Sequence, residues 1–234
     1  MKQMVKVQES PVGETVDQPP AGNKPDLRPL HGRWIWLEPV SAVKHAEELY
    51  ASFAESDPQG RVWTYMGYGP FESLEVFAEW LKEKEACRDP WFYAFVRRDT
   101  GKACGMGAFM RCDAANGAIE IGHIWMSPGL QRTREATEAI YLMIRHCFDD
   151  LGVRRLEWKC DALNAASRRA AERFGFTFEG IFRQHMIVKG RNRDTAWYAM
   201  LDKDWHRVHQ GFEAWLRPAN FDAAGKQKAK LRVG

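Results

Sequence analysis

The sequence predicts an α/β (α+β) fold in a single domain, with one mixed sheet and helices on both of its faces. Its 234 residues are enough for one large domain with extra material at the ends. Hydrophobic residues make up 45% and charged residues 28% of the chain, which is close to the globular average. Strand-like and helix-like patterns follow in the order β, α, α, β, β, β, α, β, α, β, β without repeats. This order favours a mixed, mostly antiparallel sheet.

The charge balance excludes some classes of partner. Subtracting 31 acidic from 34 basic residues leaves +3, and no concentrated basic patch lies in the body of the chain. We therefore expect no nucleic-acid partner and no membrane-surface partner. Basic residues gather only near the end, at Lys226, Lys228, Lys230 and Arg232, where a solvated tail is the simpler interpretation.

Cysteine usage indicates a reducing compartment. The five cysteines are odd in number and widely spaced, and no C-x-x-C pair occurs, which argues against a disulfide framework and against a metal site. The first twenty residues lack the apolar segment of a signal peptide, and no stretch is apolar over a membrane-spanning length. We expect a cytoplasmic protein without a metal.

The first half of the chain begins with an extension. Residues 1–30 contain five prolines and few large apolar side chains, so we expect an extended arm outside the core. Strand composition from Arg33 to Val40 leads to Ser41, which caps a helix with apolar residues at three- and four-residue steps. A second helical pattern covers about Ser73 to Cys87.

Three strands should then form an antiparallel meander, because turn signals separate three β-rich stretches: Trp91–Arg97, Lys102–Arg111 and Ala118–Met126. Strand alternation in the third divides its residues into two faces. One face carries Glu120, Gly122, Ile124 and Met126, and the other carries Ile119, Ile121, His123 and Trp125. A carboxylate in a central strand needs a partner or water.

The second half continues with a long helix from about Gln131 to Leu151, which has one apolar face and stops at Gly152. The expected elements after it are a strand at Arg155–Asp161, a short helix at Asn164–Phe174, a hairpin of Phe178–Val188 and Thr195–Leu201, and a helix capped by Asp204. Residues 31–203 should form the main domain, and residues 204–234 a terminal helix with a basic tail.

Three sequence blocks carry a specific resemblance. They are Glu120–Pro128, Gln131–Ala139, and Cys160–Ser167 continuing through Glu172–Phe176. The stretch from Glu120 to Trp205 resembles the GNAT acyltransferase superfamily, and within it the RimJ/RimL-like branch of ribosomal-protein N-terminal acetyltransferases. Residues 33–111 match in element order only. The resemblance implies a GNAT fold, with residues 31–203 as the acetyltransferase domain, and direct transfer of an acetyl group from acetyl-CoA to an amine in a ternary complex.

The resemblance also implies where acetyl-CoA binds. Unpaired N–H groups at a helix N-terminus can hold a pyrophosphate. In the family's loop a glycine stands where this chain has Arg134, so Arg132, Arg134 and the Thr133 hydroxyl would supply bonds to phosphate. The alternative is that these arginines only decorate an exposed helix start. The full implied set is Trp125, Met126, Ser127, Gln131, Arg132, Thr133, Arg134, Glu135, Ala136 and Asn164.

Pro128 bears on the same site, because it cannot donate to a neighbouring strand, and pairing with the following strand should fail there. In the family this splayed strand end binds the pantetheine arm through its backbone. Asn164 is either a helix N-cap alone or also a partner of the pantetheine.

Two catalytic residues follow from the resemblance. Ser167 is the candidate general acid for the CoA sulfur, against the alternative of an ordinary first-turn serine. Glu120 is the candidate base, direct or through water, against a structural ion pair with an arginine. His123 and His185 are further candidates that also suit core or rim positions, and Cys160 suits a packed thiol better than a nucleophile.

The acceptor is the least determined feature. The Rim-like blocks favour a protein or peptide N-terminal α-amine, whose ordinary pKa of about 8 leaves some of it neutral without a strong base. An aromatic, glycine-rich loop at residues 55–71 would also suit an antibiotic or a polyamine. The other hypotheses are a non-catalytic CoA-binding sensor or interaction module, and a dimeric scaffold; a homodimer is compatible with each.

Overall fold

The computed structural model describes residues 11–16, 20 and 22–233. Within these residues, eight strands form one sheet in the order β1-β2-β3-β4-β5-β6-β8-β7, in which β5 and β6 are the only parallel neighbours. The strands are β1 (Leu30–His31), β2 (Ile35–Pro39), β3 (Trp91–Arg97), β4 (Ala103–Asp113), β5 (Ala118–Met126), β6 (Arg155–Asp161), β7 (Thr177–Val188) and β8 (Arg191–Leu201). The expected mixed, mostly antiparallel sheet is confirmed.

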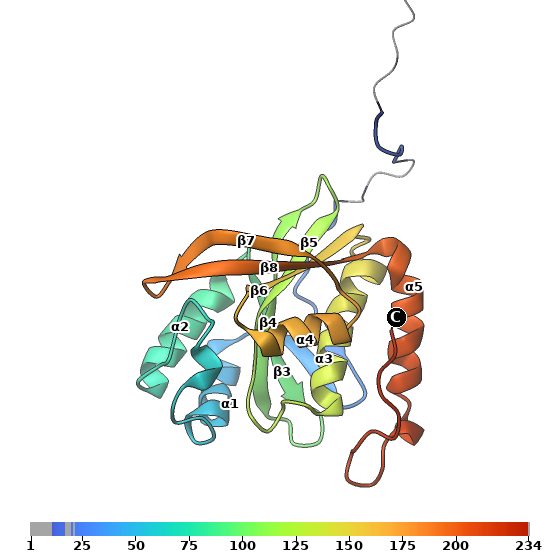
Figure 1. The fold of residues 1–234 in the computed structure, drawn as a ribbon. Coiled ribbons are helices and arrows are strands. Elements are labelled where there is room, and N and C mark those ends of the chain that lie inside the picture. The colour runs from blue at the N-terminus through green and yellow to red at the C-terminus, as the bar shows by residue number, and fades with distance from the viewer. Residues whose placement is uncertain (1–10, 17–19, 21, 234) are drawn as a thin grey trace, which may run out of the picture.

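Helices cover both faces of the sheet, and the main ones are α1 (Ala42–Ala54), α2 (Leu74–Ala86), α3 (Arg134–Arg145), α4 (Ala165–Arg173) and α5 (Asp202–Trp215). Helices α1 and α2 lie together on one side, and α3 and α5 lie on the other (Figure 1). Two apolar cores result, one under α1 and α2 and a larger one shared by α3, α4 and α5.

Most expected elements occur, but two helix starts differ. Helix α3 begins at Arg134 and not at Gln131, because Thr133 is its N-cap and its Oγ1 accepts the backbone N–H of Ala136 at 3.1 Å. Its last turn widens into a π-helix at His146–Asp150. Helix α5 begins at Asp202, with Leu201 as N-cap, so the expected cap at Asp204 is wrong.

The N-terminal extension is not wholly outside the core. Residues 1–10, 17–19 and 21 of it lie outside the described residues. Leu30 is buried in the larger core and pairs with Leu37 of β2, and the Tyr93 hydroxyl donates to the Arg28 carbonyl at 3.2 Å. The exclusion of residues 1–30 from the core is therefore wrong for their last residues.

A buried carboxylate joins α3 to the start of β2. The Glu138 side chain accepts three backbone N–H groups, those of Arg33, Trp34 and Ile35, at 2.8, 2.7 and 3.2 Å. Burial raises the pKa of this carboxyl, and the three donated bonds oppose that shift. Glu138 therefore fixes the start of α3 relative to the sheet.

A bulge in β5 reverses the expected alternation of its side chains. Met106 of β4 faces Trp125, whereas Ala108 faces Gly122, so β5 contains an extra residue there. His123 takes up the distortion with a left-handed φ of 51°. Beyond the bulge, Trp125 joins the core under α1 and α2, while Ile124 and Met126 pack against the other core: the alternation predicted from the sequence is wrong after Gly122.

The parallel strands β5 and β6 separate early. They pair at Ala118–Arg155, Ile119–Leu156 and Glu120–Glu157 only, so pairing ends well before Pro128. The expected gap exists, but Pro128 is not its cause, because the strands have already diverged beside the bulge. The diverging ends form a fork inside the sheet.

Candidate functional site

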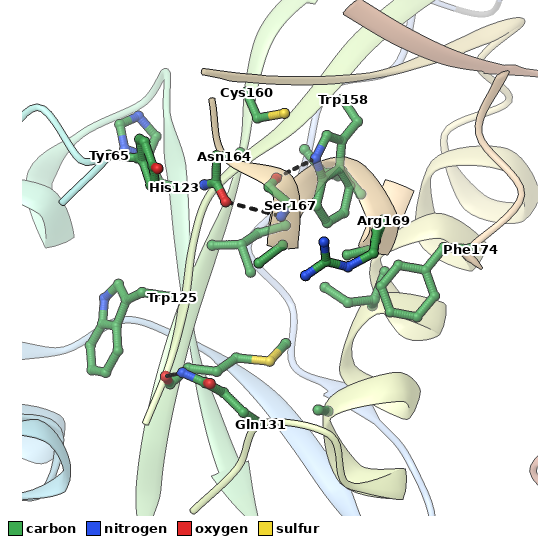
Figure 2. Close-up of a pocket in the computed structure, with 18 of the residues that line it drawn as sticks. Tyr65, His123, Trp125, Gln131, Trp158, Cys160, Asn164, Ser167, Arg169 and Phe174 are labelled. Atoms are coloured by element: carbon green, nitrogen blue, oxygen red, sulfur yellow. Dashed lines mark hydrogen bonds between the residues drawn. The ribbon is translucent and has the colours of Figure 1, made fainter. Parts of the chain in front are cut away.

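The fork opens into the main cavity of the described residues, with a volume of about 1080 Å³. Its walls are the second half of β5, the end of β6, the start of α3 and one side of α4. Figure 2 shows Asn164 and Ser167 at the start of α4, with Gln131 below them and Tyr65 and His123 to their left.

Ser167 is held by two hydrogen bonds in the cavity wall. Its backbone N–H donates to Asn164 Oδ1 at 3.0 Å, which confirms Asn164 as the N-cap of α4. Its hydroxyl oxygen accepts the indole N–H of Trp158 at 2.9 Å (Figure 2). Because the oxygen is engaged as an acceptor, the hydroxyl keeps its own proton as a donor, with the Cys160 thiol and the cavity as the two directions in which it can donate.

The Cys160 thiol lies beside Ser167 and is buried. Burial raises its pKa, and a hydrogen bond from Ser167 partly opposes that shift. A nucleophilic cysteine needs a stabilised thiolate, so this environment suits a packed thiol.

The start of α3 forms one end of the cavity. Gln131 Nε2 donates to the Met126 carbonyl at 3.0 Å, which ties this turn to the end of β5. Arg132 has a left-handed φ of 63° and lines the cavity. Arg134 also lines the cavity, but its guanidinium lies 4.9 Å from the centre of the Trp34 ring and its Nε donates to Glu135 at 3.1 Å.

The cavity gathers most of the residues singled out in the sequence. Those that line it are Glu120, Trp125, Met126, Gln131, Arg132, Thr133, Arg134, Ala136, Asn164 and Ser167. Ser127 and Glu135 are not among the lining residues. Both are buried: Ser127 accepts turn bonds from Leu130 and Gln131, and Glu135 pairs with Arg134.

Glu120 lies at the branch point of the fork. It is 4% exposed, and its Oε2 contacts Arg111 at 2.7 Å and Lys159 at 3.0 Å. Lys159 also pairs with Glu157 at 2.6 Å and lies 4.0 Å from the centre of the Trp197 ring. The structural ion pair is thus present, while Glu120 Oε1 has no partner among the described residues.

His123 faces the cavity from the bulge. Its Nδ1 is 3.2 Å from the Tyr68 hydroxyl, and the two rings stack with centroids 5.7 Å apart. Burial lowers the pKa of His123 to about 4, with smaller contributions from Arg111 and Lys84. The imidazole is therefore neutral at neutral pH.

The part of the cavity away from α3 is covered by a roof made of two segments, the α1–α2 loop and the β7–β8 hairpin. The α1–α2 loop is tied to the β6–α4 turn by the Tyr65 hydroxyl, which donates to the Leu163 carbonyl at 3.3 Å. On its other side, Lys189 of the β7–β8 hairpin donates to the Trp63 carbonyl at 3.0 Å. His185, whose Nδ1 is 2.9 Å from Thr195 Oγ1, lines the wall beneath this roof.

Several residues that line the cavity were not predicted from the sequence to do so. They are Arg111, Trp158, Lys159, Arg169, Arg193 and Lys226. The period-two pattern of β6 was the available signal for Trp158 and Lys159, because it places them on opposite faces of a strand next to the implied site. For Arg193 and Lys226 no local pattern exists, since long-range packing brings both to the cavity.

Comparison with known proteins identifies the family of this chain. The sequence model of the acetyltransferase (GNAT) domain matches residues 35–177. The chain belongs to the GNAT acetyltransferase family. It is therefore an acyltransferase with acetyl-CoA as acetyl donor, and the resemblance seen in the sequence is confirmed.

Solved structures agree with the GNAT assignment. A GCN5-related N-acetyltransferase from Brucella melitensis is 46% identical, with a TM-score of 0.88 over 92% of this chain and 96% of that chain. A GNAT acetyltransferase from Chromobacterium violaceum ATCC 12472 is 40% identical, with a TM-score of 0.76 over 85% of this chain and 98% of that chain.

A curated relative from Bacillus subtilis is similar over part of its length. YdaF of Bacillus subtilis, named as a ribosomal N-acetyltransferase, is 30% identical over 105 residues, or 45% of this chain. The match spans 57% of the length of YdaF, little more than half. Within the described residues of this GNAT chain, no cluster of side chains could hold a metal ion, and no helix is long and apolar enough to cross a membrane.

The buried histidine makes stability depend on pH. The unfolded chain binds a proton on His123 below its ordinary pKa of 6.5, whereas the folded chain does so only below about 4. The free energy of unfolding should therefore fall by up to about 3 kcal/mol between these pH values. In urea unfolding at a series of pH values, His123→Phe should flatten this part of the curve, and the exposed control His206→Gln should not. An unchanged slope in His123→Phe would show that His123 is protonated in the fold.

Proposed function

We propose that this GNAT enzyme acetylates the N-terminal α-amine of a protein or peptide. The observation that carries the proposal is the roofed half of the cavity, which opens beside Ser167 and carries more basic than acidic groups. Its charged lining residues are Arg61, Arg111, Lys159 and Arg193, against Glu120 and Asp161, and of the four cations Arg193 is the one without an ion-pair partner among the described residues.

This charge balance argues against acceptors with many amines. A polyamine or an aminoglycoside carries several positive charges, and like charges in a partly desolvated cavity repel. Arg193 adds to this repulsion of polycations, because it has no ion-pair partner among the described residues and its Nε is buried without a hydrogen bond. A chain end with a single amine fits these surroundings better, and the name of YdaF agrees with that class.

Three features of the chain fit acetyl-CoA. The α3 N-terminus suits a pyrophosphate, with Arg132 beside it as a cation that has no ion-pair partner in the described part of the chain. The unpaired strand ends of the fork leave backbone N–H and C=O groups for the amide-bearing pantetheine arm. The cavity is large enough for a ligand of this length. When bound, acetyl-CoA supplies an acetyl thioester.

Two side chains suit the proton transfers. We assign Ser167 as the acid, because Trp158 donates to its oxygen and so polarises the O–H bond toward a departing sulfur. We assign Glu120 as the base through Oε1, because this oxygen has no partner among the described residues while Arg111 and Lys159 fix Oε2. The backbone beside the bulge is the candidate oxyanion donor.

An acceptor panel tests the function. Mass spectrometry with acetyl-CoA should detect acetylation of a short peptide with a free N-terminus. A matched peptide with a blocked N-terminus and an internal lysine should stay unmodified, as should spermidine and an aminoglycoside. Acetylation of the polyamine alone would refute the assigned acceptor class, and binding of acetyl-CoA without product for any amine would indicate a sensor.

Removing the Ser167 hydroxyl should affect turnover more than binding. We expect Ser167→Ala to lower kcat by about 10² to 10⁴ with little change in acetyl-CoA affinity, since the sulfur charge develops only as the thioester breaks. Trp158→Phe keeps the hydroxyl but removes its donor, so a smaller loss is expected, and the exposed Ser56→Ala is the control. Full kcat in Ser167→Ala would leave solvent as the proton source.

A pH profile separates the base role of Glu120 from its structural role. Glu120→Gln should lower kcat at least about tenfold at neutral pH and recover as pH rises, because alkaline solution deprotonates the amine without help. The control Glu157→Gln removes the other partner of Lys159, so it should lower the melting temperature without that pH dependence. An equal loss at every pH in both variants would leave Glu120 as a structural residue only.

A further inference from the structure

The C-terminal segment, residues 216–233, folds back onto the start of α3. It lies outside the part of the chain that matches the GNAT domain. Phe221 is buried, with its ring 5.4 Å from Trp34 and 5.0 Å from Trp215. The red loop in Figure 1 is this segment, below the end of α5. The lysines of the expected solvated tail are exposed, but the segment that carries them is docked.

Both ends of the loop at residues 222–227 are fixed. On one side Asp222 Oδ1 accepts the backbone N–H of Lys226 at 2.8 Å, and on the other the Trp215 indole donates to the Gln227 side chain at 2.9 Å. Further along, Val233 is buried and its carbonyl accepts a bond from the Arg207 guanidinium. The loop therefore has a defined place and shape.

That place is the α3 end of the cavity. The Arg134 guanidinium lies 4.9 Å from the Trp34 ring and 5.7 Å from the Phe221 ring, so it joins three distant segments. A Cβ on Gly225 would lie 3.8 Å from Arg134 Cζ, which puts the loop directly against this cation. Lys226 and Gln227 consequently line the cavity.

Basic side chains without ion-pair partners in the described part of the chain line this end of the cavity, which we call its mouth. Arg132, Arg169, Arg173 and Lys226 all line it, and none has an ion-pair partner among the described residues. Arg173 has only the Thr137 hydroxyl, at 3.2 Å, and the faces of aromatic rings. Such a concentration of unpaired cations attracts a ligand with several negative charges.

We propose that Lys226, presented by the docked loop, binds the 3′-phosphate of the CoA nucleotide. This inference rests on the proposed acetyl-CoA site. CoA carries a pyrophosphate and a separate phosphate on its ribose. Because the pyrophosphate matches the α3 N-terminus and Arg132, the ribose phosphate is left for a cation from another element. Lys226 comes from the loop docked beside the α3 N-terminus, and its ammonium has no partner among the described residues.

Calorimetry with two donors tests the assignment. Titrations with acetyl-CoA and with acetyl-3′-dephospho-CoA isolate the contribution of the one phosphate. Lys226→Ala should weaken acetyl-CoA binding about threefold to fivefold, as expected for an exposed ion pair, and leave the dephospho compound unchanged. The control Lys230→Ala, from the same exposed tail but away from the cavity, should change neither. The preference for the phosphorylated donor should shrink as salt rises.

A second variant tests the docking. Phe221→Ala removes the ring that packs on Trp34, so it should reproduce the selective loss for acetyl-CoA while circular dichroism stays unchanged. Equal effects of Lys226→Ala on both donors, or no effect on either, would overturn this inference while leaving the acetyl-CoA site intact. A wild-type protein that binds neither donor would refute the proposed site and this inference together.

Discussion

Ion pairing at Glu120 holds β5 and β6 together at the last position where their backbones still pair. Glu120 faces Glu157 across that pair, and Lys159 lies between the two carboxylates at 3.0 and 2.6 Å. A buried carboxylate without a partner would be costly, so the lysine and Arg111 are required there. Because the strands are held at the branch point, they can diverge beyond it without the sheet separating further. The cavity depends on this arrangement.

The bulge at His123 determines which side chains the fork presents. An extra residue in β5 sends Trp125 into the core under α1 and α2, and it turns Ile124 and Met126 to the other core. Both cores thus hold the strand by large apolar groups on either side of its unpaired stretch. This anchoring replaces the missing ladder bonds, so the strand stays in place with its backbone free to bind a ligand.

The sequence predicts local elements well, because capping residues and periodicity act over a few positions. Asn164 is the N-cap that its position before a helix predicts, and β6 has the predicted ends. The alternation of β5 fails because a bulge depends on the register of two strands, which no single-strand pattern contains. The docking of the C-terminal segment could not be predicted for a similar reason. Phe221 is apolar in a polar segment, but its partner Trp34 is far away in the chain. The site residues drawn from family motifs largely meet in one cavity, whereas those contributed by distant segments, such as Arg193, could not be placed.

The fork has a further consequence for solubility. Two strands that stop pairing inside a sheet leave two open strand edges facing each other, and open edges are templates for unwanted pairing with other chains. Here the α1–α2 loop and the β7–β8 hairpin cover them, tied down through Tyr65 and Lys189. Under the proposed function, the same cover limits which acceptors can enter. Loosening this cover to admit bulkier substrates would expose strand edges to other chains, so the proposed acceptor range and the tendency to aggregate would change together.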